Sequence, residues 1–492
     1  MGRYAGVEIS TLYSNGPNHT DVDGVPVFWA EGGSERSASL SFRVGTVDES
    51  FTQSGITHLV EHLALHRLRD AGHPMNGMVR RKRTSFTASG TDEELVRFFG
   101  AVCRSLRSLP LERVPQEKQV LLTESLRRPP NLISLLMGLH CGRGPYGRGQ
   151  GEFGLYKLQP SQVQRWSDMH FTRDNAVFWI SGPVPSDLRL DLPSGVRKPV
   201  PNPQTIPWLQ PPLCCYRNIP GVALSSLTRW STALSIATGA ALSRLRERLR
   251  FEEGISYSVW GDADRIAPVH AHLSIGCDCA SHHADRAADI LLEVLTDVAS
   301  NGPTPSEVRT LTEQSKRFFT SSTSIATLLD LRAGAELEGL PTKPVDTFYN
   351  NLSTLKPSDI AAAMQEAMRT AILVIPEGCR PGRNTFPEYP SNSPTLVEGR
   401  LFRRSPKPRK GVPLDRIYLS HDGITLAGVN GRVQTVFFAS CVALYKETQD
   451  NGRRLLLGED GSTIEITPSE WEDGMELAAL VDLAIPDERI VR

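Results

Sequence analysis

A weak internal repeat constrains the fold of this chain more than any other feature. The segment LQPSQVQRW (158–166) precedes the apolar run AVFWISG (176–182), and much later LKPSDIAAA (355–363) precedes AILVIPEG (371–378). Each pair has the pattern of a helix that begins at a proline and is followed by a buried strand. We therefore expect two α+β domains of like plan, joined by a proline-rich linker.

The chain has 492 residues, a length that suits about three domains. We expect an α+β fold with two homologous α/β-sandwich domains and a small β-rich domain after them. The last part carries short strand-like runs with DG and NG pairs between them, and it closes with the apolar-periodic MELAALVDLAI. It resembles a pleckstrin-homology-like domain, a β-meander capped by a helix. The expected boundaries are 1–195 for the first domain, 196–212 for the linker, 213–380 for the second domain, 381–412 for a proline-rich basic linker and 413–492 for the C-terminal domain.

Several elements of the first domain can be predicted from apolar spacing and from turn residues. VPVFWAE and ASLSFRVG predict a β-hairpin within 24–48, and TSFTASG (84–90) predicts a strand. Helices are expected at 55–72, where Gly72 is a plausible end, and at 92–109 and 114–128.

Composition indicates a soluble globular protein, and the cysteine pattern favours the cytoplasm. The formal net charge is −1, which gives no general reason to expect nucleic acid as a partner. The basic runs VRRKR (79–83) and FRRSPKPRK (402–410) are expected to be solvated faces or linkers rather than binding sites. The first residues lack the apolar core of a signal peptide, and no apolar stretch has the length of a membrane span. The eight cysteines are scattered, which favours reduced and mostly buried thiols.

The segment HLVEH (58–62) is the strongest candidate for a chemical site. On a helix, His58 and His62 lie one turn apart on one face, so both imidazoles can reach one Zn²⁺ ion. Glu61 lies on the same side, where it can take a proton from an attacking water. Catalytic zinc usually has three protein ligands and one open position, so a third ligand must come from elsewhere. Three polar residues that merely share a surface are the alternative.

The helix expected at 114–128 offers two candidates for the missing ligand. Glu117 and Glu124 are seven residues apart, which is two helical turns, so they project from one face. A solvated helix glutamate is the alternative for either residue alone. We expect His66 to be a partly exposed helix residue rather than a further ligand.

At this point the sequence resembles a known family, the inverzincin metallopeptidases of the pitrilysin, insulinase and mitochondrial-processing-peptidase group, peptidase family M16. HLVEH matches the inverted zinc motif of that family. The resemblance extends over about residues 20–378, through four further segments: SFRVGTVDESFTQSGITHLVEH, MNGMVRRKRTSFTASGTDEEL, EKQVLLTES and, in the second domain, LRERLRFEEGISYSVWG.

The resemblance implies a role for each matching residue. It implies that His58, His62 and Glu124 bind Zn²⁺, that Glu61 is the catalytic base, that Glu117 supports the zinc ligands from behind, and that Asn76, Arg250 and Tyr257 bind the substrate. Only 61 residues separate His62 from Glu124, fewer than the family usually has, and the shortfall lies before Asn76. We therefore expect any departure from the family site in the floor of the substrate channel.

The implied function is a zinc-dependent endopeptidase that cleaves peptides or unfolded polypeptides inside a chamber. In the family, the Arg and Tyr residues come from the half of a clamshell that faces the zinc domain, so this chain is expected to form a homodimer, with a heterodimer as the alternative. The ligand set would also accept Mn²⁺ or Co²⁺. Two other functions compete with the endopeptidase: a non-catalytic peptide-binding subunit of a processing peptidase, and a scaffold that acts through its C-terminal β-domain.

Overall fold

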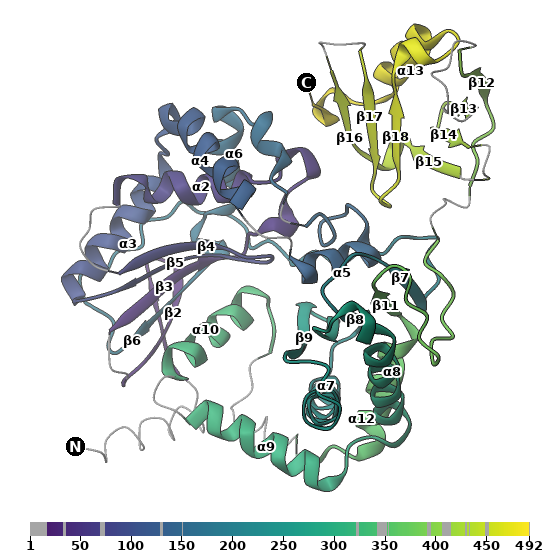
Figure 1. The fold of residues 1–492 in the computed structure, drawn as a ribbon. Coiled ribbons are helices and arrows are strands. Elements are labelled where there is room, and N and C mark those ends of the chain that lie inside the picture. Colours follow the sequence, from purple (N-terminus) through teal and green to yellow (C-terminus); the bar gives the residue numbers. More distant parts are fainter. Residues whose placement is uncertain are drawn as a thin grey trace.

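Two mixed sheets with the same strand order form most of the structure, and a smaller β-rich unit follows them (Figure 1). The structure is a computed structural model. It describes residues 17–32, 36–68, 74–127, 131–149, 151–320, 324–341, 352, 354–390, 395–405, 415–428, 431, 433–447 and 452–491.

The first sheet carries the predicted metal helix on one of its faces. Its strand order is β1-β2-β6-β3-β5-β4, and β4 is an edge strand. The strands are β1 Asn18–Val22, β2 Val25–Ala30, β3 Ser37–Phe42, β4 Met75–Val79, β5 Thr84–Ser89 and β6 Ala176–Ser181. The helices over this face are α2 Ile56–Leu65, α3 Asp92–Arg107, α4 Val114–Arg127 and α6 Pro160–His170, and α2 contacts α3, α4, α6 and β4.

The hairpin predicted within 24–48 is wrong. β2 and β3 do form, but β6 lies between them, parallel to β2 and antiparallel to β3. Every residue of β6 is buried. A strand that is apolar on both faces is more stable in the middle of a sheet than at its edge, which explains why β6 lies between β2 and β3. The predicted helix at 55–72 also differs, because α2 ends at Leu65 and continues only as the 3-10 turn η3, His66–Leu68. The predicted end at Gly72 lies outside the described residues.

The second sheet repeats the plan of the first without its outer strand. Its order is β7-β11-β8-β10-β9, in which β11 is parallel to β7 and antiparallel to β8, as β6 is to β2 and β3. This shared order confirms the internal repeat. The strands are β7 Leu213–Tyr216, β8 Val222–Arg229, β9 Val259–Ala267, β10 His270–Cys277 and β11 Ala371–Ile375.

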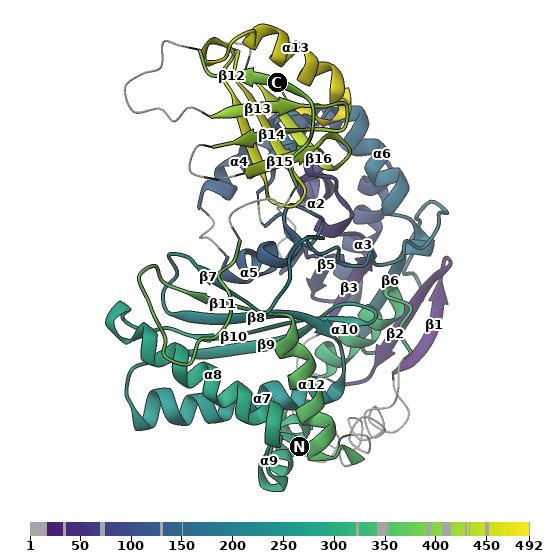
Figure 2. The same cartoon turned by 90° about the vertical axis from the view of Figure 1, so that its right-hand side faces the viewer.

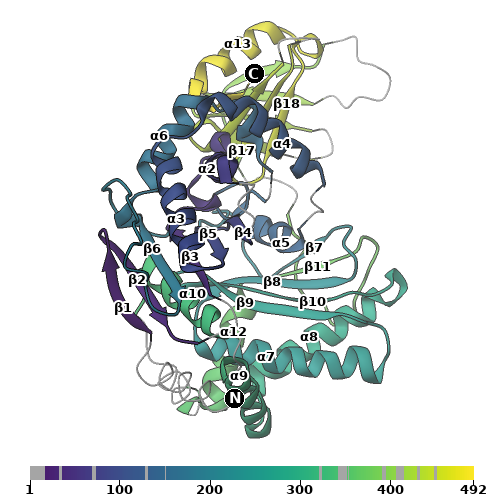
Figure 3. The same cartoon turned by 90° about the vertical axis from the view of Figure 1, so that its left-hand side faces the viewer.

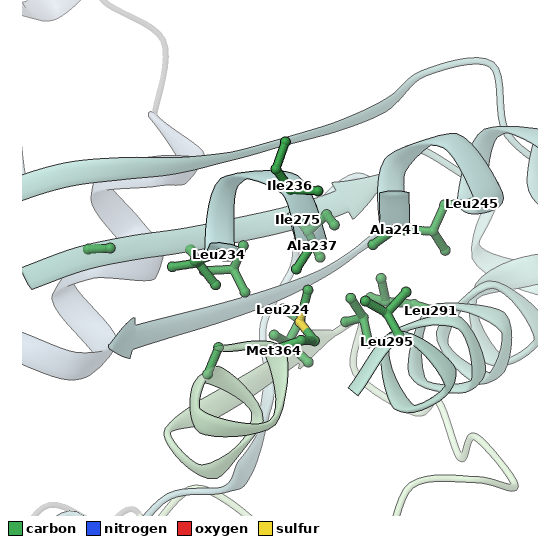
Figure 4. Close-up of a cluster of buried hydrophobic side chains, with 14 of the residues drawn as sticks. Leu224, Leu234, Ile236, Ala237, Ala241, Leu245, Ile275, Leu291, Leu295 and Met364 are labelled. Atoms are coloured by element: carbon green, nitrogen blue, oxygen red, sulfur yellow. The ribbon is translucent and has the colours of Figure 1, made fainter. Parts of the chain in front are cut away.

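Three helices bury one face of the second sheet (Figures 2 and 3). They are α7 Thr232–Arg246, α8 Ala284–Asn301 and α12 Pro357–Arg369, and α9 Pro305–Thr320 follows α8. Figure 4 shows their apolar side chains meeting those of the strands, with Leu224 and Ile275 from the sheet facing Ala237, Leu291 and Met364. This cluster is the core of the second half of the chain.

The two halves exchange a helix. α5, Leu132–Cys141, belongs to the first half but packs with Leu136 and Leu139 against Ala223 and Ile372 of the second sheet. α10, Ser324–Leu337, belongs to the second half but contacts β2, β3 and β6 of the first sheet. Each sheet is therefore closed on its second face by a helix from the other half.

The C-terminal unit holds two four-stranded sheets and one long helix, as the strand-rich pattern predicts. The sheet orders are β12-β13-β14-β15 and β18-β17-β16-β19. The elements are β12 Arg400–Arg403, β13 Arg416–Leu419, β14 Gly423–Ala427, β15 Val433–Phe437, β16 Cys441–Lys446, β17 Arg454–Gly458, β18 Thr463–Ile466, α13 Gly474–Ala484 and β19 Ile490–Val491. β12 lies inside the segment expected to be a linker, because its pairing with β13 satisfies its backbone. The likeness to a pleckstrin-homology domain stays a prediction.

The C-terminal unit packs on the first half next to α2 (Figure 3). Phe51, which precedes α2, is buried together with Ala443, Leu457 and Val491. Arg143 donates hydrogen bonds to the carbonyl oxygens of residues 458 and 462. Within the part of the chain that the structure describes, no helix is both long and apolar enough to span a membrane. Seven of the eight cysteines are buried, and none forms a disulfide.

Candidate metal centre

The helix that carries HLVEH begins at a buried carboxylate. Glu49 accepts the backbone N–H groups of Gly55 and Thr57 with its two oxygens, each at 3.0 Å. These groups have no partner inside α2, and negative charge is favourable at a helix N-terminus. Burial raises the pKa of Glu49 to about 6, against the opposing effects of the Arg148 charge and of these hydrogen bonds. Glu49 therefore fixes the turn from which His58 projects.

His58 and His62 face the same space, as their spacing predicts. Their ring centroids are 4.8 Å apart and their planes are nearly perpendicular. Burial lowers the pKa of His62, and the neighbouring His58 lowers it further. The neutral form, which is the form that binds a metal, is thereby favoured.

The outer nitrogen of each imidazole is held by a glutamate. His58 Nδ1 lies 2.7 Å from Glu152 Oε1, and His62 Nδ1 lies 3.2 Å from Glu117 Oε2. Glu117 is 1% exposed and also lies 3.4 Å from His66. A carboxylate on Nδ1 fixes the ring orientation and leaves Nε2 as the metal-binding atom. The structure therefore places Glu117 behind His62, and it adds Glu152, which sequence analysis missed.

Glu61 lies between the two inner nitrogens and against the edge strand. Its Oε2 is 3.8 Å from His58 Nε2 and 3.9 Å from His62 Nε2. The strand β4 approaches it so closely that a Cβ atom on Gly77 would lie 1.8 Å from Glu61 Oε1. Glycine at position 77 therefore provides the space for the Glu61 carboxylate.

The donor atoms fit a zinc ion. One possible metal-binding atom from each of His58, Glu61 and His62 lies within 4.8 Å of the other two. Among the described residues, these three form the group of His, Cys, Asp or Glu side chains that is close enough to hold a metal ion. Glu124, at 45% side-chain exposure, lies with Oε2 3.8 Å from His62 Nε2. Neighbouring ligands of a tetrahedral zinc site lie about 3.3–3.6 Å apart, given bonds of about 2.0–2.2 Å. The separations of 3.8–3.9 Å between neighbouring donor atoms are slightly longer than this spacing.

Other predicted site residues lie further out. Asn76 is exposed on β4, where Thr87 donates a hydrogen bond to its carbonyl oxygen, and its neighbour Gly77 is the residue that meets Glu61. Arg250 lies in the π-helical turn η7, Glu247–Glu252, with its guanidinium 4.8 Å from the centroid of the Tyr257 ring. Tyr257 is 77% exposed. Among the described contacts, none joins Arg250 or Tyr257 to α2 or β4.

A cavity of about 500 Å³ opens beside His58. His58, Glu61 and Glu152 line one part of it, and residues 77–81 of β4 and the following turn line another. The cavity therefore connects His58 and Glu61 with the edge strand β4.

Several solved structures with this fold are described as proteases or as a domain of a peptidase. The peptidase M16 inactive domain from Pseudomonas fluorescens is similar with a TM-score of 0.61 and 14% identity, over 74% of this chain and 99% of that chain. The fold is that of the M16 peptidases. A protease from Helicobacter pylori is similar with a TM-score of 0.61 and 15% identity, over 73% of this chain and 99% of that chain.

Two further comparisons refine this result. The periplasmic protease PqqL from Escherichia coli has a TM-score of 0.61 and 13% identity over 90% of this chain, which corresponds to 57% of PqqL. Residues 205–315 match the family model described as the peptidase M16 inactive domain. That range covers most of the second half and excludes HLVEH. No protein of curated function matches the sequence.

Proposed function

We propose that this chain is a zinc-dependent endopeptidase that cleaves peptides or unfolded polypeptides. The observation that carries the proposal is the convergence of His58 and His62 on one space, with their outer nitrogens held by Glu152 and Glu117. Glu117 is buried and Glu152 is largely buried, and a carboxylate in such a place is costly unless it is paired, so their pairing with the two histidines supports a functional role. The likeness in fold to a protease from Helicobacter pylori is consistent with this proposal.

His58, His62 and Glu124 would hold the metal. A bound zinc ion would supply Lewis acidity at the scissile carbonyl and would lower the pKa of a nearby water. Glu152 and Glu117 would keep both imidazoles in the orientation that this requires. Glu124 Oε2 already lies 3.8 Å from His62 Nε2, on the side where the metal would bind.

Glu61 would move the proton. It lies at the centre of the cluster, where it can accept a proton from the attacking water and pass it to the leaving amine. Contact with Gly77 limits the directions in which its carboxylate can turn. A base held in this way needs little reorganisation during the reaction.

The edge strand β4 would bind the substrate backbone. Arg80 donates its N–H to Arg83, and Pro74 accepts a hydrogen bond from Ser89, so these two residues face β5. By the alternation of a strand, the N–H and C=O groups of Met75, Gly77 and Val79 face away from β5. An extended peptide can add to such an edge, with its backbone held next to Glu61.

A second copy of this chain would complete the site. Arg250 and Tyr257 are exposed and stacked on each other, without a described contact to the cavity of their own chain. The exposed pair is therefore available to the cavity of a facing subunit. We propose a homodimer, in which each subunit offers this pair to the peptide held by the other.

A non-catalytic peptide-binding subunit is the second candidate. The match of residues 205–315 to an inactive-domain model favours it. HLVEH and the glutamates that hold its histidines lie outside that range, which favours the endopeptidase.

Cleavage of a peptide mixture tests the proposal. The wild-type chain, Glu61→Gln and the control Glu93→Gln, an exposed residue of α3, are incubated with unrelated peptides with and without a chelator, and products are identified by mass spectrometry. We expect cleavage by the wild type and by the control only, and loss of cleavage with the chelator.

Two results would contradict the endopeptidase. Wild-type protein that retains zinc and binds peptides but cuts none would favour the non-catalytic subunit. Cleavage that survives both Glu61→Gln and the chelator would assign the reaction to another site.

A further inference from the structure

The basic run VRRKR is not the solvated face that composition suggests. It follows β4 and forms the turn into β5. Lys82 pairs with Glu338 at 2.7 Å, and Arg83 pairs with Asp330 of α10. Arg81 lies 3.3 Å from Asp264 of β9. Three of the four cations thus connect the turn to the second half of the chain, and each has an acidic partner.

Arg80 is the exception. Its Nε donates to Met78 Sδ at 3.0 Å, and no acidic side chain pairs with it among the residues that the structure describes. Arg80 is exposed and lines the same cavity as His58 and Glu61. A guanidinium in the candidate substrate cavity is therefore available to a ligand.

Arg148 adds a second guanidinium to this part of the cavity. Its Nη2 donates to the Thr46 carbonyl oxygen, while its Nη1 is buried and has no hydrogen-bond partner in the described part of the chain. The Thr46 N–H donates to the Arg80 carbonyl oxygen at 3.2 Å. Thr46 therefore links the segments that carry Arg80 and Arg148. Gly45 permits this contact, because a Cβ atom there would lie 2.3 Å from the Arg80 carbonyl oxygen.

The acidic residues of the cavity make hydrogen bonds or contacts of their own. Glu49 accepts two N–H groups at the start of α2 and also interacts with the Arg148 charge, while Glu152 holds His58 and Glu61 lies between the two histidines. The cavity is thus acidic near the metal position and basic near the turn after β4. A buried guanidinium nitrogen without an acceptor costs free energy that a ligand carboxylate would recover.

We propose that Arg80 and Arg148 bind a carboxylate of the peptide substrate. This inference rests on the proposed function and names its substrate class, acidic peptides. Gly77, beside Glu61, and Arg80 are three residues apart, which is about 10 Å along a strand at about 3.3 Å per residue. A peptide paired with β4 would place its carboxylate about three residues from the bond that is cut.

The carboxylate has two possible sources. An Asp or Glu side chain can reach the two arginines whichever way the peptide runs along β4. The terminal α-carboxylate can reach them only if the peptide runs parallel to β4, with its C-terminal end toward Arg80.

Binding to the zinc-loaded Glu61→Gln protein tests the inference without requiring turnover. The probes are fluorescent nonapeptides in which one Glu is moved from position to position, each paired with its Gln counterpart and each made as a free acid and as a C-terminal amide. We expect at least one Glu peptide or free acid to bind about tenfold to a hundredfold tighter than its neutral counterpart, as charge-assisted hydrogen bonds imply. If the tighter binding is lost when Gln replaces Glu, the bound carboxylate belongs to a side chain. If it is lost when the C-terminus is an amide, the bound carboxylate is the terminal one.

Arginine variants in the same background assign the preference. Arg80→Gln and Arg148→Gln should each reduce the ratio of affinities toward one, while the control Arg97→Gln, an exposed residue of α3, should keep it. Arg80 is exposed, so its variant decides the test even if Arg148→Gln fails to fold, and circular dichroism checks both. Equal affinity for charged and neutral peptides, no peptide binding at all, or a preference unchanged in both variants would overturn the inference.

Cleavage by the wild type separates this inference from the proposed function. If carboxylate peptides bind preferentially but remain uncut, the endopeptidase proposal fails and the carboxylate site stands. If peptides are cut without a preference for a carboxylate, the endopeptidase stands and the carboxylate site fails.

Discussion

Gly77→Ala tests whether the edge strand positions the catalytic base. The added Cβ atom would lie 1.8 Å from Glu61 Oε1 and 2.6 Å from its Cδ, whereas real Cβ contacts essentially never fall below 3.0 Å. The flexible Glu61 side chain will move rather than the strand, so its carboxylate shifts by about 1.2 Å, the difference between 3.0 and 1.8 Å. A misplacement of about 1 Å costs on the order of a hundredfold in rate. We therefore expect kcat to fall about a hundredfold.

The same substitution should leave the fold and the metal intact. Alanine restricts the unfolded chain more than glycine by roughly 0.5–1 kcal/mol, which offsets the cost of turning Glu61, so the free energy of unfolding should change by less than about 1 kcal/mol. The assays are cleavage of a quenched fluorescent peptide, zinc content and unfolding in urea. The control is Gly100→Ala in α3, whose Cβ atom would meet only Arg104 Nη1 at 3.4 Å. Wild-type kcat in Gly77→Ala, or loss of zinc or of the fold, would refute the reasoning.

Three further predictions concern the ligands and a buried histidine pair. Glu152→Gln should lower the zinc affinity about tenfold to a hundredfold, because it weakens the hydrogen bond to His58 Nδ1, the nitrogen that faces away from the metal. A competitive chelator titration measures the affinity, and an unchanged value would argue against this role. Glu124→Gln should lower zinc affinity more than Glu152→Gln does, and an equal or smaller loss would remove Glu124 from the ligand set. Burial lowers the pKa of His140 to about 4 and that of His272 to about 3, so the unfolded chain binds protons more readily than the folded one. The free energy of unfolding should fall by a few kcal/mol as the pH drops from about 6.5 toward 4, and urea titrations should find less loss in the variant His140→Gln/His272→Gln.

Periodic sequence predicted the helices well, because each buries one apolar face. The helices expected at 92–109 and 114–128 are α3 and α4, with small differences at their ends. The same spacing predicted that His58 and His62 share one face of α2. The place of Glu117 behind the histidines was implied by the family resemblance, because it depends on the contact between α2 and α4 rather than on spacing within one helix.

Non-local pairing could not be predicted in the same way. The hairpin within 24–48 failed because β6, more than 130 residues later, enters between its two strands. Glu49 and Glu152 lie in irregular segments, where no period indicates which way a side chain points. Gly77 shows no signal in the sequence beyond its lack of a side chain, and its role follows only from the close approach of β4 to α2.

The exchange of α5 and α10 has a consequence for how such a chain can evolve. Leu136 of α5 is buried on the second sheet, while Leu329 of α10 is buried with Val177 and Trp179 of the first. A gene fission within 196–212 would leave each product with an uncovered apolar sheet face and an orphan helix. Recombination with a relative would therefore succeed only when each sheet is inherited together with the helix from the other half that covers it. The unit of selection is thus the two halves together rather than either half alone.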